Sequence, residues 1–318
     1  MKHNGFLLLP PEVRLQIYDH LFSTTRISAG TIITAQSSRK IKPRPNCLAI
    51  LRTCRIIHHE ARDLWIGKVT FAFGTIMDML DTLTPLPDAL VSQIRHVRVA
   101  STPLWTEWYA PADASDNSIP LGSKHFVWTL GLLPALRLDT LTVIDAEAPT
   151  STGVGLRELL QFGTGWDELR FISRDTQLLA YARVVLMMSG AGLLDSSPTV
   201  WHWDLTSRDS GADLQIYLST LRGTPGTVED ERTRRPFVEN LSRLHEIDTF
   251  GESDERPLLR SEEEDREMMV VVRLSDENTL QEHPLRRMNL PWSKLREFCS
   301  IKTQVPGDCE DFYLAYLS

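Results

Sequence analysis

Apolar residues recur at helical spacing in two segments near the start of the chain. The first segment, residues 11–22, carries two apolar stripes, one spaced by four residues and one spaced by three and four. Pro11 suits the first position of a helix because its missing N–H would have no partner there, and Glu12 places a negative charge in the first turn. The stripes consist of Val13, Ile17 and Leu21 and of Leu15, Tyr18 and Phe22. The pattern predicts a helix with more apolar surface than one small core usually covers.

The second segment, residues 47–65, predicts another helix. Its apolar residues alternate in spacing between three and four, and Leu51 and Trp65 widen the stripe. They are Cys47, Ile50, Cys54, Ile57, Ala61 and Leu64. The polar, basic stretch between the two segments, residues 23–46, is interpreted as an inserted loop. Glu12 is explained by a helix terminus and Glu60 by a surface position, so no catalytic group stands between the helices.

Together the two segments follow the pattern LxLPPEVRLQIYxxLF and then LRTCRxIxxEAxxLW. This pattern resembles the F-box-like domain common in fungal proteins, and the later Phe71 and Phe73 fit it too. The resemblance implies a short helical bundle that binds a Skp-type adaptor. The adaptor-facing residues that it implies are Leu9, Pro10, Pro11, Glu12, Ile17, Leu21, Leu51, Cys54 and Trp65.

The resemblance further implies a substrate-recruiting adaptor of a cullin-type (SCF) ubiquitin ligase, in which the rest of the chain captures a protein substrate. An alternative stays open, namely a non-catalytic interaction scaffold whose helices pack on the downstream chain and bind no Skp-type adaptor. The first hypothesis expects residues 9–21 to be exposed. The second expects the change Ile17→Asp to bury an unpaired charge and to unfold the protein.

A different pattern recurs downstream. It consists of three apolar residues, with two residues between the first and the second and one residue between the second and the third. Its copies begin at Ile94, Leu138, Trp166 and Val200, and a short helix is predicted before each, such as Ile76–Leu83. These units resemble irregular leucine-rich repeats, in which each strand–helix unit must stack on its neighbours to bury its apolar face. The predicted fold class is α+β or α/β, with an F-box-like helical module followed by an irregular strand–helix body. A compact α/β sandwich would produce the same signature.

Two domains are expected. Residues 1–72 form the F-box-like helical module with the inserted basic loop 23–46, and residues 73–318 form the substrate-recognition body. Within the body we expect a flexible acidic segment at about 223–267, a buried strand at Met268–Leu274 and a last helix that begins at Pro291.

Aromatic residues gather in a long loop predicted over Thr102–Ser123 and near the fourth copy of the downstream pattern. Such side chains more often anchor a loop to the core than bind a ligand, yet recognition concentrates in loops of this kind. The candidate partner-binding residues are Trp105, Trp108, Tyr109, Trp201 and His202.

Charge is divided unevenly along the chain. Residues 1–68 contain 11 Lys and Arg against 4 Asp and Glu, whereas the remainder contains 23 against 38. The acidic body argues against a nucleic-acid partner, because its field would repel phosphate. The sequence has four cysteines without a CxxC pair, no secretory leader and no long apolar run. These features predict a soluble cytoplasmic or nuclear protein.

Motifs for common chemistries are missing from the sequence. It contains no GxSxG nucleophile elbow and no GxxxxGK[ST] phosphate loop. Cys54 and His58 stand four residues apart, which would place both near one metal ion on a helix face, but no further ligands stand at fitting positions. We therefore expect a protein that is not an enzyme, with no catalytic residue, no cofactor and no metal.

Overall fold

The structure is a computed structural model of the chain. It describes residues 5–33, 38–41, 48–101, 104–106, 122–124, 129–145, 156, 159–160, 165–176, 213–237, 266–273, 291–297, 299–300 and 316. Every structural statement below concerns these residues.

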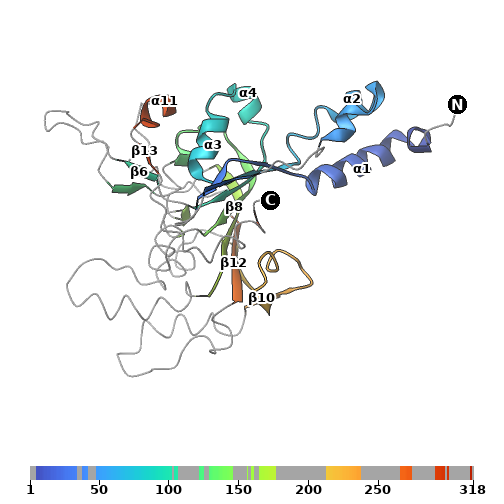
Figure 1. The fold of residues 1–318 in the computed structure, drawn as a ribbon. Helices are drawn as coiled ribbons and strands as arrows, with labels where there is room; N and C mark the ends of the chain where they lie inside the picture. Colours follow the sequence, from blue (N-terminus) through green and yellow to red (C-terminus); the bar gives the residue numbers. More distant parts are fainter. Residues whose placement is uncertain are drawn as a thin grey trace, which may run out of the picture.

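An eight-stranded sheet organises a mixed α/β fold that has few helices (Figure 1). Its strand order is β1-β4-β5-β8-β9-β12-β10-β11. The first five strands in this order run parallel to one another, and the last three pair antiparallel. The strands are β1 (Arg26–Ala29), β4 (Thr70–Phe73), β5 (His96–Ala100), β8 (Leu138–Ile144), β9 (Trp166–Ser173), β12 (Arg266–Arg273), β10 (Asp213–Arg222) and β11 (Arg234–Pro236).

Three of the four copies of the downstream pattern are adjacent parallel strands. The second apolar positions of β5, β8 and β9 stand in register, as do the third. All of these positions lie in the largest buried cluster, so stacking of neighbours covers each strand as the pattern predicts. The rows are Val97, Leu141 and Leu169, and Val99, Val143 and Phe171. The fourth copy, at Val200, lies outside the described residues.

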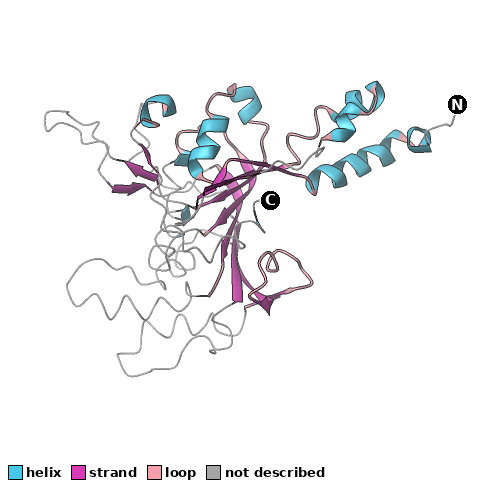
Figure 2. Cartoon of the chain, in the orientation of Figure 1, coloured by secondary structure: helices cyan, strands magenta, loops and turns pink. Residues whose placement is uncertain are grey.

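Helices cover one face of the sheet (Figure 2). The helix α3 (Ile76–Leu83) has the bounds predicted from sequence, and the Thr75 side chain caps it by accepting the N–H of Asp78. Two shorter helices, α4 (Asp88–Val91) and α11 (Trp292–Leu295), contribute Val91, Trp292 and Leu295 to the same cluster. The predicted last helix is present, with Pro291 as the residue before its first turn and α11 beginning at Trp292. The predicted strand at residues 268–274 is confirmed as far as Arg273, the last residue of β12.

The opposite face of the sheet carries a smaller apolar cluster. Ala100, Ile144 and Ile172 stand in register at the ends of β5, β8 and β9 and pack with the buried ring of Tyr316. A hairpin of β2 (Thr31–Ile33) and β3 (Ser38–Lys40) adds Ile32 to this cluster. The segment predicted as a loop at residues 23–46 therefore contains strands, since β1, β2 and β3 all fall within it.

The N-terminal region contains one long helix, α1 (Pro11–Ser23), between the 3-10 turn η1 (Gly5–Leu8) and β1. The predicted continuous helix over residues 47–65 is wrong. It is a 3-10 turn, η2 (Ala49–Arg52), followed by the seven-residue helix α2 (Arg55–Ala61). Cys54 between them is extended, and the Thr53 hydroxyl donates to the Ile50 carbonyl at 2.7 Å, which ends the turn before α2 begins. An F-box-like bundle is not shown by this arrangement alone.

Backbone pairing joins the predicted module to the body. Strand β1 falls within residues 1–72, and β4 crosses the predicted boundary, since it runs from Thr70 to Phe73. β4 pairs in parallel with β1 and also with β5, which lies in the body. A separate small sheet consists of β13 (Cys299–Ser300), β6 (Leu104–Thr106) and β7 (Gly122–Lys124). The loop predicted over residues 102–123 therefore contains β6 and the first two residues of β7.

Both ends of the segment expected to be flexible, about 223–267, have defined structure. The loop between β10 and β11 closes around the buried carboxylate of Glu267, the second residue of β12. This carboxylate accepts the N–H groups of Gly226 at 2.8 Å, Thr227 at 2.9 Å and Val228 at 3.1 Å. Three such bonds satisfy a buried charge and fix the loop to the sheet. Residues 238–265 lie outside the described part of the chain.

Candidate functional site

Large apolar side chains are exposed on and beside α1. At 100° per residue, the buried residues Tyr18 and Phe22 form one face of this helix, while Val13 and Ile17 lie to one side of that face and Leu15 to the other. The exposed fractions are 38% for Val13, 41% for Leu15 and 38% for Ile17. We define the N-terminal apolar surface as Leu8, Val13, Leu15, Ile17, Ile56 and Leu64.

The most exposed member of this surface precedes the helix. Leu8 is 72% exposed and belongs to the turn η1, which contains no buried residue. Ile56, on the first turn of α2, is 53% exposed. Figure 1 shows α1 extending away from the sheet toward the N-terminus, with α2 on the same side of the molecule. Exposed apolar residues concentrated in one region of a molecule are typical of interaction sites.

A buried polar network fastens α1 to α2 beneath these exposed side chains. The Arg14 guanidinium forms a fork with Glu60, with Nε to Oε2 at 3.1 Å and Nη2 to Oε1 at 2.5 Å. The Tyr18 hydroxyl donates to the same carboxylate at 3.0 Å. Arg14 and Tyr18 are one helical turn apart, so both reach one acceptor on α2. Arg14 is 8% exposed and Tyr18 is fully buried.

The network shifts the titration of its members. Hydrogen bonding from the Arg14 side chain holds the pKa of Glu60 below its usual value, so the carboxylate stays charged. Burial, followed by the hydrogen bond to Glu60, raises the pKa of Tyr18 to about 12. Tyr18 therefore remains a hydroxyl donor at neutral pH, and the contact between the two helices is intact there.

The adaptor-facing residues implied by the resemblance fall into two groups. Pro10, Pro11, Glu12 and Ile17 are exposed, and Leu9 and Leu21 are partly exposed. In contrast, Leu51, Cys54 and Trp65 pack against a small buried cluster formed by Tyr18, Phe22, Ile57, Ala61 and Val69. The structure thus leaves the α1 half of the implied surface accessible and uses the second half mainly to support it.

The supporting network was missed by the sequence analysis, which placed Glu60 on the surface. A signal for it was present, because Arg14 and Tyr18 stand four residues apart on the face of α1 that also contains Phe22. A charged residue on the buried face of a helix requires a partner, and Glu60 is that partner.

The candidate partner-binding aromatics cannot be assembled into a site. Trp105 lies in β6, where it pairs with Ser300 of β13 and Ser123 of β7. Trp108, Tyr109, Trp201 and His202 lie outside the described residues.

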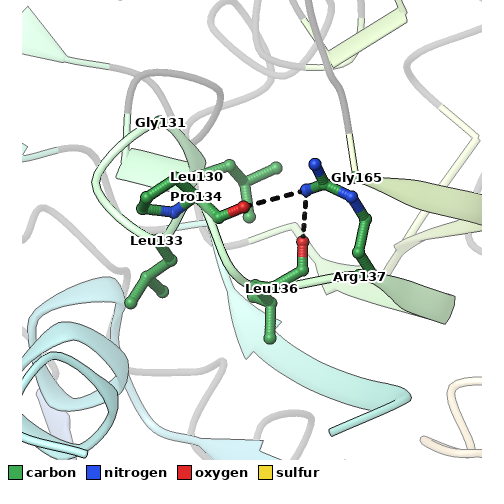
Figure 3. Close-up of a pocket in the computed structure, with 7 residues that line it drawn as sticks. All are labelled: Leu130, Gly131, Leu133, Pro134, Leu136, Arg137 and Gly165. Carbon is green, nitrogen blue, oxygen red and sulfur yellow. Dashed lines mark hydrogen bonds between the residues drawn. The ribbon is translucent and has the colours of Figure 1, made fainter. Parts of the chain in front are cut away.

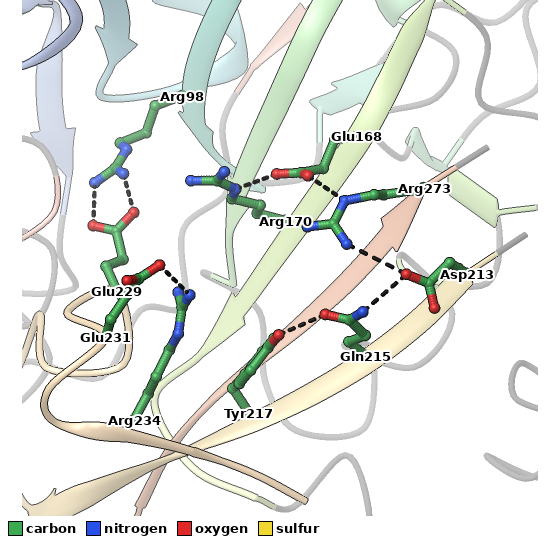
Figure 4. Close-up of polar contacts among 10 residues, drawn as sticks. All are labelled: Arg98, Glu168, Arg170, Asp213, Gln215, Tyr217, Glu229, Glu231, Arg234 and Arg273. Carbon is green, nitrogen blue, oxygen red and sulfur yellow. Dashed lines mark hydrogen bonds and ion pairs between the residues drawn. The ribbon is translucent and has the colours of Figure 1, made fainter. Parts of the chain in front are cut away.

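The face of the sheet opposite α3 carries a cluster of charged and polar side chains, which extends across β9, β12 and β10 (Figure 4). Glu168 accepts from Arg170 Nε at 2.6 Å and from Arg273 Nε at 2.7 Å. Arg273 and Gln215 also donate to Asp213, and the Tyr217 hydroxyl donates to Gln215. Because these side chains already pair with one another, they offer little unbalanced charge to a ligand.

A shallow hollow lies at the turn before β8 (Figure 3). Arg137 Nη1 donates there to the carbonyls of Pro134 at 3.1 Å and Leu136 at 2.9 Å. The hollow has room for about one water molecule, which is far less than a substrate needs.

Among the described residues, no three His, Cys, Asp or Glu side chains gather as metal ligands would. None of the helices described here has the length and apolar character that crossing a bilayer requires.

Comparisons with protein-family models, with curated proteins and with solved structures each found no match.

Proposed function

We propose that the chain is a substrate-recruiting adaptor of a cullin-type ubiquitin ligase. In this proposal the N-terminal helices form an F-box-like module whose apolar surface binds a Skp-type adaptor, and the sheet-containing body binds a protein substrate. The role is non-catalytic, because its contribution is to raise the local concentration of substrate near the ligase.

The observation that carries the proposal is the exposure of Val13 and Ile17 on one side of a helix that is already anchored. Tyr18 and Phe22 hold α1 from its other face, so the exposed residues are not needed to keep the helix in place. Val13 and Ile17 can contribute to the apolar centre of one interface, whereas Leu15 lies on the other side of the helix. Both side chains are only 38% exposed, so docking of each contributes less than burying a fully exposed side chain does, which is about 1.5–3 kcal/mol.

A second candidate function, a scaffold that binds no Skp-type adaptor, is favoured by one observation. Leu51, Cys54 and Trp65 pack against the small N-terminal cluster, and Trp65 lies 6.3 Å from the Phe71 ring of β4 between centroids. These residues therefore serve the attachment of α2 to the sheet. In the scaffold hypothesis, the whole module has that supporting role.

A binding measurement separates the two functions. Purified full-length protein is titrated calorimetrically with a purified Skp-type adaptor, beside a Pro11→Ala/Ile17→Asp variant. The matched control is Gln16→Asp, which adds the same charge at an exposed polar position of the same helix. We expect the wild type and the control to bind and the double variant to lose binding while it melts cooperatively. A folded wild type that does not bind would reject the adaptor function and leave the scaffold.

A further inference from the structure

We propose that Arg14 is the positioning residue of the N-terminal apolar surface, and that it acts by holding the turn before α1. This inference rests on the proposed function, since it assigns a role within the same surface. We define the docking turn as Gly5–Pro10, which includes η1 and carries the exposed side chain of Leu8.

The Arg14 guanidinium links three separate elements of the N-terminal region. Arg14 Nη1 donates to the Leu9 carbonyl at 2.5 Å and to the Leu7 carbonyl at 3.4 Å. Its Nε and Nη2 are occupied by the fork with Glu60 of α2. The side chain therefore links the docking turn, α1 and α2 at one point.

The two carbonyls flank Leu8. Fixing the backbone on both sides of this residue fixes the direction in which its exposed side chain projects. Within the turn, the Leu9 N–H also donates to the Phe6 carbonyl at 3.2 Å. Phe6 and Leu7 are partly buried against the small N-terminal cluster, and the Phe6 ring lies 5.9 Å from that of Tyr18. The apolar contacts locate the turn, and Arg14 sets its orientation.

An arginine is required for this geometry. The planar guanidinium presents donors in several fixed directions, so it can serve a carboxylate fork and two carbonyls together. A lysine ammonium is a point charge that can pair with Glu60 but cannot reproduce the fork and reach the turn as well. The substitution Arg14→Lys therefore keeps the charge and removes the positioning contacts.

Positioning affects binding through preorganisation. A turn that is ordered before binding loses less conformational freedom when the partner docks. Releasing the turn should weaken binding of the Skp-type adaptor even though no residue that contacts the partner has been changed. A residue with a merely structural role would instead loosen α1 and α2 together with the turn.

Hydrogen exchange and adaptor binding test the inference in the full-length protein. For Arg14→Lys we expect amide exchange at residues 6–9 to become about tenfold faster, as the loss of one charge-assisted hydrogen bond predicts, while peptides from α2 and α3 keep their protection. The Kd for the adaptor should rise by about the same factor. The matched control is Arg62→Lys, at an exposed arginine beside Asp63 that touches neither the turn nor α1.

Each outcome bears on one of the two proposals. Unchanged exchange at residues 6–9 in Arg14→Lys would overturn the positioning role. So would an increase that is equally large in α2, because that result indicates general loosening. If the wild type does not bind the adaptor, the proposed function fails, and the exchange measurement still decides whether Arg14 orders the turn.

Discussion

Glu60 accepts hydrogen bonds from Arg14 and from Tyr18, and this sets how the N-terminal helices respond to acid. The pKa of Glu60 is lower in the folded protein than in the unfolded chain, chiefly because the Arg14 side chain donates to its carboxylate. Its stabilising effect is therefore complete above the unfolded-state pKa of about 4.3. The effect is lost as the pH falls through the lower pKa of the folded state.

We predict that Glu60→Gln lowers the melting temperature at neutral pH, because Arg14 then has no charged partner. The difference from the wild type should be constant down to about pH 5 and should shrink as the pH falls below about 4.3. Thermal melts of both proteins at a series of pH values provide the measurement. A difference that is the same at every pH would show that the charge of Glu60 has no part in the contact.

Gly30 is a second position where one residue determines local packing. Its φ of +102° lies in the left-handed region, and a Cβ built on it would stand 2.3 Å from Asp78 Cγ. That carboxylate accepts the Thr31 N–H at 3.0 Å and the Thr75 hydroxyl at 2.7 Å, so it cannot simply move aside. Gly223 is also left-handed, with φ +58°, but has nothing within 4 Å of such a Cβ.

The comparison between these glycines predicts unequal effects of alanine. Gly223→Ala should cost about 1 kcal/mol from backbone strain alone. Gly30→Ala should cost clearly more, because a steric clash adds to the same strain. Urea unfolding of both variants measures the two free energies of unfolding. Equal losses would mean that the hairpin of β2 and β3 can shift to accommodate a methyl group.

At the scale of whole elements, α1 is predicted to tolerate substitution on its exposed side and not on its buried side. Ile17 is 38% exposed, whereas Phe22 is fully buried in the small N-terminal cluster. Ile17→Asp should retain a cooperative melt with a small shift, and Phe22→Ala should lose about 3–5 kcal/mol. Thermal and urea unfolding of both variants provide the test. Collapse of Ile17→Asp would favour the scaffold function.

Element-scale patterns also show how far the sequence could be interpreted. Apolar spacing located α3 and the three parallel strands β5, β8 and β9 because their buried rows repeat. The antiparallel strand β10 follows no such repeat and was not predicted, and the place of β12 between β9 and β10 depends on contacts far apart in the chain. The apolar spacing was also informative on both sides of Cys54, where the predicted helix is interrupted, because Ile50 and Ile57 pack in the same small N-terminal cluster.

The candidate site was less accessible to such patterns. Exposed residues such as Ile17 could be proposed from their stripe, because two stripes exceed what one small core covers. The pairing of Arg14 with Glu60 spans 46 positions in the chain, and hydrophobic spacing contains no information about it. Only the observation that Arg14 shares a face with Tyr18 hinted at a buried partner.

At the scale of the whole molecule, Arg98 connects segments that are distant in the sequence, on the face of the sheet opposite α3. Its guanidinium pairs with Glu229 of the loop between β10 and β11, where Nη1 lies 3.0 Å from Oε2. Nη1 also donates to the Tyr316 carbonyl at 3.1 Å, and Arg26 of β1 donates to the same oxygen at 2.6 Å. The charge lies over the Tyr316 ring, 5.7 Å from its centroid. Arg98 thus joins β5, the loop between β10 and β11, and Tyr316, and Arg26 joins β1 to the same carbonyl.

We predict that Arg98→Met destabilises the protein by about 3 kcal/mol, because it leaves the largely covered carboxylate of Glu229 without its counter-charge and removes a donor to Tyr316. The matched control is Arg170→Met, two strands away in the same register row. Arg170 is more exposed, and its partner Glu168 keeps the bond from Arg273, so its loss should cost less than about 1 kcal/mol. Urea unfolding of the two variants compares these values directly. Equal losses of unfolding free energy would contradict the role of Arg98 in joining these segments, and would mean that it contributes no more than the exposed Arg170 does.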